Sequence, residues 1–165
     1  VCSSDLIKRF FPEEYEVGVN ALKMVQKRVG MELSTDEAGF IALHLVNAEM
    51  EEEVGNIYEL TKLMQEITNI VKYYFKVSFD EDSVYFYRFS THLKFFCYRL
   101  LHQREVVEND DEELYAVIKK KYLNAYRCVE KISLYLNENY DYQVSNEERL
   151  YLTIHIARIV QTTEQ

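Results

Sequence analysis

The stretch Ser145–Ile156 reads SNEERLYLTIHI and contains the signals of a helix start. Ser145 and Glu148 have the spacing of a capping box, in which the serine hydroxyl accepts from the glutamate amide and the glutamate carboxylate accepts from the serine amide. The acidic residues of this first turn also suit the positive end of a helix dipole. An apolar run that includes His155 follows directly, so the stretch predicts a helix that begins here.

The same pattern occurs about 111 residues earlier, where Ser34–Leu45 reads STDEAGFIALHL. Serine, glutamate, aromatic, aliphatic and histidine positions fall in register without a gap, and His44 takes the place of His155. Further matches lie upstream, where Ile7, Lys8, Phe11 and Tyr15 correspond to Ile118, Lys119, Tyr122 and Tyr126. An internal repeat of this kind predicts two related units. We expect residues 1–54 to be the C-terminal half of one unit and residues 55–165 to be a complete second unit.

Composition favours an all-α fold. The 165 residues are 48% apolar and 28% charged, which is the mixture of a globular chain. Only four glycines and one proline are present, too few for the many turns of an all-β protein. The formal net charge of −9 lacks the basic face of a nucleic-acid binder, so we expect this segment not to contact RNA or DNA itself.

Apolar residues repeat at intervals of three and four in the intervening sequence, the pattern of amphipathic helices. Three such stripes lie within residues 60–75, 89–100 and 114–136. Residues 80–82 and 109–111 are acidic and polar and are interpreted as connections or helix starts, and residues 140–144 as an extended segment. Together these patterns predict five helices in the complete unit.

Other classes of protein are disfavoured. The three cysteines are scattered, which indicates neither a disulfide framework nor a zinc site and fits a reducing cytoplasm. No apolar run has the length of a membrane span, and residues 1–6 have the character of the cut edge of a longer chain and not of a signal peptide. Nucleotide-binding, zinc-protease and EF-hand motifs are absent from the sequence.

The candidate functional residues are histidines. His44 and His155 occupy one position in two repeats, and His92 lies in a separate helix of the complete unit, flanked by Arg88 and Arg99. A neutral imidazole accepts a phosphoryl group, and arginines suit its oxygens. Three alternatives stay open at this point. The histidines could only pack in or beside the core, the two arginines could lie on a solvated helix face, or the histidines could bind a metal ion. His102, at a helix end, is expected to have a structural or solvent role.

Four segments together resemble a known family, the PTS regulation domains (PRDs) of BglG/LicT/SacY-type transcription antiterminators. Residues 36–49 resemble the end of the first PRD. Residues 63–75, 88–100 and 150–159 resemble the opening helix and the two histidine helices of the second PRD. The resemblance covers nearly all of the chain after Leu6.

The resemblance implies a five-helix PRD bundle plus part of another, with no enzymatic activity and no cofactor. It implies that His92 and His155 accept phosphate in the second PRD and that His44 does so in the first. Arg88, Arg99 and Arg158 would support the phosphoryl group. The expected donors are the phosphocarrier HPr and a sugar-specific enzyme II of the phosphotransferase system (PTS). Phosphorylation would control a homodimer, and RNA would be bound only through an N-terminal domain that is absent here.

Two alternatives to an antiterminator are considered. PRDs also occur in DNA-binding transcriptional activators, and the chain could be an inert helical interaction module whose histidines only pack. An enzyme would need a pocket in which acid and base groups converge, and the sequence contains no sign of one.

Overall fold

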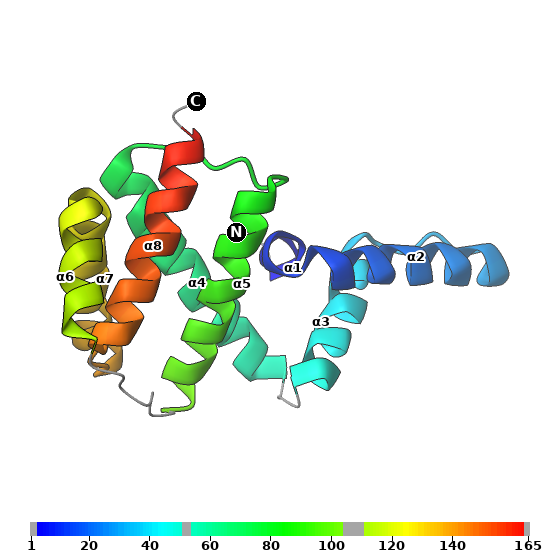
Figure 1. Cartoon of the computed structure of the whole chain (residues 1–165). Coiled ribbons are helices and arrows are strands. Elements are labelled where there is room, and N and C mark those ends of the chain that lie inside the picture. The colour runs from blue at the N-terminus through cyan, green and yellow to red at the C-terminus, as the bar shows by residue number, and fades with distance from the viewer. Residues whose placement is uncertain (1–2, 51–53, 104–110, 164–165) are drawn as a thin grey trace. The chain divides into compact units, whose positions relative to one another are not determined.

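The chain folds into helices joined by short connections (Figure 1). The structure is a computed structural model that describes residues 3–50, 54–103 and 111–163, and these residues contain no strand. The helices are α1 (Ser3–Phe10), α2 (Pro12–Val29), α3 (Asp36–Met50), α4 (Val54–Phe75), α5 (Val84–Leu101), α6 (Glu112–Lys121), α7 (Leu123–Tyr140) and α8 (Asn146–Thr163). The predicted all-α class is therefore confirmed.

The chain divides into two compact units, Val1–Gln65 and Glu66–Gln165. In the first unit, α1, α2 and α3 pack against one another. In the second unit, α8 lies between α5 and the pair formed by α6 and α7 (Figure 1). The boundary between the units falls within α4, so the division after residue 54 stays a prediction.

The internal repeat is visible in the helices. Helix α7 begins and ends 111 residues after α2, and both end at a residue in the left-handed conformation, Gly30 with φ 70° and Asp141 with φ 50°. The residue before each helix, Phe11 or Tyr122, is non-helical. The packing pairs also correspond, because α1–α2–α3 contact one another as α6–α7–α8 do. Helices α1–α3 thus match the last three helices of the second unit.

The stripe within residues 114–136 is not one helix, because the chain breaks at Tyr122. Tyr122 has φ −120° and ψ 48°, yet its amide still donates to the Ile118 carbonyl and its carbonyl accepts from the Tyr126 amide. The apolar period therefore continues across a break that no glycine or proline marks. Five helices, α4–α8, follow in the described residues from Val54 onward, in agreement with the predicted number.

The two predicted capping boxes differ in the structure. At α8 the Glu148 amide donates to the Ser145 hydroxyl over 3.2 Å and the Ser145 amide donates to the Glu148 carboxylate over 3.1 Å, as predicted. At α3 the Ser34 hydroxyl instead accepts from the Asp36 amide over 3.2 Å. The Glu37 amide donates to the Ser34 carbonyl, so the serine sits in a turn ahead of the helix.

Much of the buried core of α4, α5 and α7 comes from the predicted apolar stripes. Helix α2 crosses α3 closely at Gly18, where a Cβ atom would overlap the backbone carbonyl of Ala38. The buried residues on the predicted stripes include Leu60, Leu63, Met64, Ile67, Val71, Phe89, Leu93, Phe96, Val129, Ile132 and Leu136. The one-sided burial of these stripes is what orients the histidine helices of the second unit.

The remaining sequence expectations fall on connections and cysteines. The extended segment predicted at residues 140–144 is wrong at its start, because Tyr140 ends α7 and Asp141 is left-handed, while residues 141–145 are neither helix nor strand. Asp111 caps α6 by accepting from the Leu114 amide. Residues 109 and 110 and Cys2 lie outside the described residues. Cys97 and Cys128 are buried free thiols. Among the described helices, none combines the length and the apolar character required to cross a membrane.

Candidate functional site

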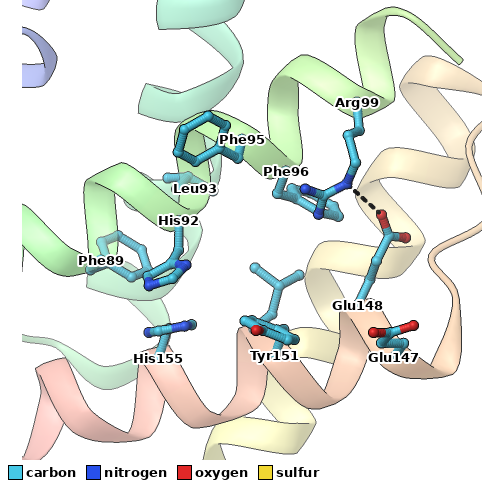
Figure 2. Close-up of a pocket in the computed structure, with 11 residues that line it drawn as sticks. Phe89, His92, Leu93, Phe95, Phe96, Arg99, Glu147, Glu148, Tyr151 and His155 are labelled. Carbon is cyan, nitrogen blue, oxygen red and sulfur yellow. Dashed lines mark ion pairs between the residues drawn. The ribbon is translucent and has the colours of Figure 1, made fainter. Parts of the chain in front are cut away.

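His92 of α5 and His155 of α8 meet in the second unit. Their rings stack with centroids 3.8 Å apart and an angle of 24° between the ring planes. Figure 2 shows the two imidazoles facing one another from opposite helices. The His92 side chain is exposed and that of His155 is half-buried, so the pair lies at a surface that solvent reaches.

Local sequence positions both histidines. Ser83 is the N-cap of α5, and its hydroxyl accepts from the Phe86 amide over 3.1 Å. From this start, buried Phe89, Leu93 and Phe96 form the inner face of α5, and His92 lies at its edge. On α8, Leu152 and Ile156 are buried on either side of His155. Each histidine therefore sits at the margin of an apolar stripe, where two packed helices bring the margins together.

A cavity of about 390 Å³ opens beside the histidine pair. Its walls come from α5 and α8 and are mainly aromatic and aliphatic, with one basic group and two acidic groups at the end away from the histidines (Figure 2). The lining residues are Phe89, His92, Leu93, Phe95, Phe96, Arg99, Glu147, Glu148, Tyr151, Leu152 and His155. An apolar pocket with a few convergent polar groups is the usual form of a binding site.

The site keeps both imidazoles neutral. Partial desolvation of its ring lowers the pKa of His92. Burial, followed by the charges of His92 and Arg158, lowers the pKa of His155 to about 4. Two stacked rings cannot both gain a proton without repulsion, and both stay unprotonated near pH 7. A neutral ring has a nitrogen lone pair available for attack on an electrophile such as phosphorus.

An ion pair closes the far end of the cavity. Arg99 Nε lies 3.9 Å from Glu148 Oε1, and the Glu148 side chain is only 2% exposed. Glu148 also accepts from the Tyr142 hydroxyl over 2.8 and 3.0 Å and from the Ser145 amide. Burial and the hydrogen bond to Glu148 raise the pKa of Tyr142, so the phenol remains a donor. The carboxylate is therefore held by groups of its own helix start.

The other predicted residues are placed differently. Arg99 lines the cavity, whereas Arg88 and Arg158 are exposed and do not line it. His44 belongs to the first unit, where it is exposed on α3. His102 caps the end of α5 with its ring stacked on Tyr98 at 4.1 Å, which agrees with a structural role.

Sequence patterns did not assign the polar cavity residues Glu147, Glu148 and Tyr151 to the site. They predict Glu148 only as a helix cap and Tyr151 only as a member of the repeat. Tyr151 lies one helical turn before His155, with ring centroids 5.7 Å apart, and its ring is 6.1 Å from that of His92. The spacing of four residues on a predicted helix is the signal that would have placed Tyr151 beside the histidine.

The metal alternative gains no support from the described residues, which contain no group of three or more histidine, cysteine, aspartate or glutamate side chains able to hold an ion. His92 and His155 form a pair without a third ligand of this kind. The cavity lining combines Arg99 and the two imidazoles with the carboxylates of Glu147 and Glu148.

Comparison with known proteins places this geometry in a family. The model of the PRD domain matches residues 3–48 and 65–159. The chain is 50% identical over 153 residues to transcription antiterminator LicT of Bacillus subtilis, covering 93% of this chain and 55% of LicT. It is 45% identical to the beta-glucoside operon antiterminator of Dickeya chrysanthemi, over 93% of this chain and 54% of that protein. It is 26% identical to the PtsGHI operon antiterminator of Bacillus subtilis, over 90% and 52%.

The chain spans about half the length of the curated relatives it matches. These relatives are regulators of transcription, which confirms the prediction that the chain is not an enzyme. The resemblance found in the sequence is confirmed as well. The matched segments include both helices that carry the stacked histidines, and they cover most of both units. On this evidence the chain belongs to the PRD domain family.

Proposed function

We propose that the chain is the regulatory region of a sugar-responsive transcription antiterminator and that His92 and His155 are its phosphate acceptors. The observation that carries the proposal is the stacked pair of neutral imidazoles at one end of a cavity. The names of the relatives, which are antiterminators, support the regulatory role. His44 is proposed as a further acceptor because it occupies the equivalent position in the first repeat.

The proposed reaction is phosphoryl transfer between imidazoles. A ring nitrogen of His92 or His155 attacks the phosphorus of a phosphohistidine on HPr or on a sugar-specific enzyme II. A new P–N bond forms while the P–N bond to the donor breaks, and the donor imidazole leaves with its electron pair. Arg99, and to a lesser degree the exposed Arg88 and Arg158, would offset the charge that arrives.

The regulatory consequence follows from charge. A phosphorylated side chain carries about −1.5 to −2 charges at neutral pH. Placed between α5 and α8, that charge biases the packing of two helices that meet the rest of the second unit. We propose that this change controls a homodimer and, through it, RNA binding by a domain outside this chain.

Phosphotransfer in vitro tests the proposal. The purified chain is incubated with phosphorylated HPr, and the labelled residues are mapped by mass spectrometry under conditions that preserve phosphohistidine. We expect label on His92 and His155, its loss from the second unit in the H92A/H155A variant, and unchanged labelling in H102A, the matched control at the end of α5. An unlabelled wild-type chain, tested with HPr and with enzyme II, would favour the inert helical module.

A further inference from the structure

The cavity has two functional ends that are related by helix geometry. On α5, His92 and Arg99 lie seven residues apart, and on α8 His155 and Glu148 have the same separation. Seven residues are two helical turns, or roughly 10 Å. The histidines therefore face each other at one end of the cavity, and the arginine faces the glutamate at the other (Figure 2).

Arg99 is held loosely. Its Nε lies 3.9 Å from the Glu148 carboxylate, beyond hydrogen-bond distance. The same Nε atom is buried and has no hydrogen-bond partner among the described residues. A buried donor without an acceptor is costly, so Arg99 would gain from an oxyanion that enters the cavity. Its side chain is long and ends in a planar group whose geometry matches phosphoryl oxygens.

Glu148 does not depend on Arg99. The Tyr142 hydroxyl and the Ser145 amide both donate to its carboxylate, over distances from 2.8 to 3.1 Å. These donors fix the carboxylate at the start of α8. Arg99 can therefore leave Glu148 without breaking the cap of the helix.

We propose that Arg99 binds the phosphoryl group carried by His92 or His155, and that Glu148 competes with that group for the arginine. The inference rests on the proposed function for the identity of the acceptors. In the unphosphorylated chain Arg99 neutralises Glu148. After phosphorylation it turns toward the new dianion, and Glu148 retains only Tyr142 and Ser145. Phosphorylation is thereby sensed at the start of α8, two turns away from the modified ring.

Chemical phosphorylation tests this exchange without a protein donor. Phosphoramidate transfers its phosphoryl group to an imidazole nitrogen as ammonia leaves. The second pKa of the phosphoryl group is then measured by ³¹P NMR in the wild-type chain and in R99Q, E148Q and R88Q. Glutamine at position 148 keeps the capping box, and Arg88 is the exposed arginine of the same helix.

A cation beside the phosphoryl group lowers its pKa, so R99Q should raise that pKa by roughly one unit, whereas R88Q leaves it nearly unchanged. E148Q should lower it, because the arginine is released from its competitor. In the R99Q/E148Q double variant, the change in the phosphoryl pKa caused by E148Q should largely vanish, because this double-mutant cycle isolates the competition for Arg99. Circular dichroism and urea unfolding of each variant verify the fold.

Three results would overturn the proposal: an R99Q value equal to that of R88Q, an E148Q effect that persists without Arg99, or no reagent label on His92 and His155. A failure of transfer from HPr and enzyme II alone would contradict the proposed donors and leave the role of Arg99 standing.

Discussion

At the scale of single residues, the stacked imidazoles determine the chemistry of the site. Rings whose centroids lie 3.8 Å apart repel each other when both are protonated. Desolvation acts in the same direction on both rings. Both imidazoles are therefore neutral nucleophiles, and their protonation is unfavourable in the folded chain.

This arrangement predicts a dependence of stability on pH. The pKa of His155 is lowered to about 4 in the folded chain, against about 6.5 when unfolded, so the unfolded state binds more protons between these values. Stability from this source is fully present above pH 6.5 and is lost as the pH falls toward 4. Between pH 7 and pH 5 the free energy of unfolding should therefore fall by roughly 1–3 kcal/mol less in H155Q than in the wild-type chain, as measured by urea unfolding at both pH values.

Carboxylates of the chain also titrate in acid, so the comparison with H155Q isolates the histidine. Equal losses in the wild-type chain and H155Q would show that His155 takes up its proton as easily in the folded state as in the unfolded state. H102Q is the matched control, because His102 is exposed at the end of α5.

At the scale of elements, the start of α8 links stability to the site. Ser145 and Glu148 cap the helix, and the same Glu148 carboxylate closes the cavity. A helix whose cap also contacts the ligand site couples its first turn to events there. The equivalent segment before α3 lacks this arrangement, because the Ser34 hydroxyl accepts from the Asp36 amide instead of the Glu37 amide.

The Ser145→Ala substitution tests the cap directly. Loss of the hydroxyl leaves the Glu148 amide without its acceptor, so we expect the free energy of unfolding to fall by about 1 kcal/mol. Ser145→Thr retains the hydroxyl and should cost much less. Urea unfolding followed by circular dichroism measures both. If the two variants were equally stable, the hydroxyl would contribute nothing to the helix.

At the scale of the whole molecule, the two copies of the repeat differ in the helices that pack against them. In the second unit, α8 contacts α5 as well as α6 and α7. Helices α1–α3 of the first unit correspond to α6–α8 alone. Large apolar side chains are exposed in the first unit. They include Val17, Met24, Val25 and Val29 of α2, Met31 after it, and Phe40 of α3.

Exposed apolar surface of this kind predicts association between copies of the chain. Val17 and Met24 are seven residues apart and share a side of α2, with 53% and 65% of their surfaces exposed. We expect size-exclusion chromatography with light scattering to find a dimer and M24K to weaken it. Leu134 of α7 is 62% exposed, and L134K serves as the matched control. A monomeric wild-type chain would exclude pairing with a second copy.

Local signals in the sequence determined the helical class, the repeat and the two histidine helices. Caps, apolar periods and the scarcity of glycine and proline act over a few residues, so they can be detected without coordinates. The repeat placed His44 and His155 in equivalent positions for the same reason. The break at Tyr122 could not be predicted, because its hydrogen bonds nearly continue those of the flanking helices.

Only the tertiary structure brought His92 and His155 into contact, selected Arg99 over Arg88 and Arg158 as a wall of the cavity, and turned Glu148 from a helix cap into a group of the site. These choices depend on how α5 and α8 cross, which is set by the close packing of side chains distant in sequence. A helical period states which side of a helix is buried. It does not state which residue of another helix that side will meet.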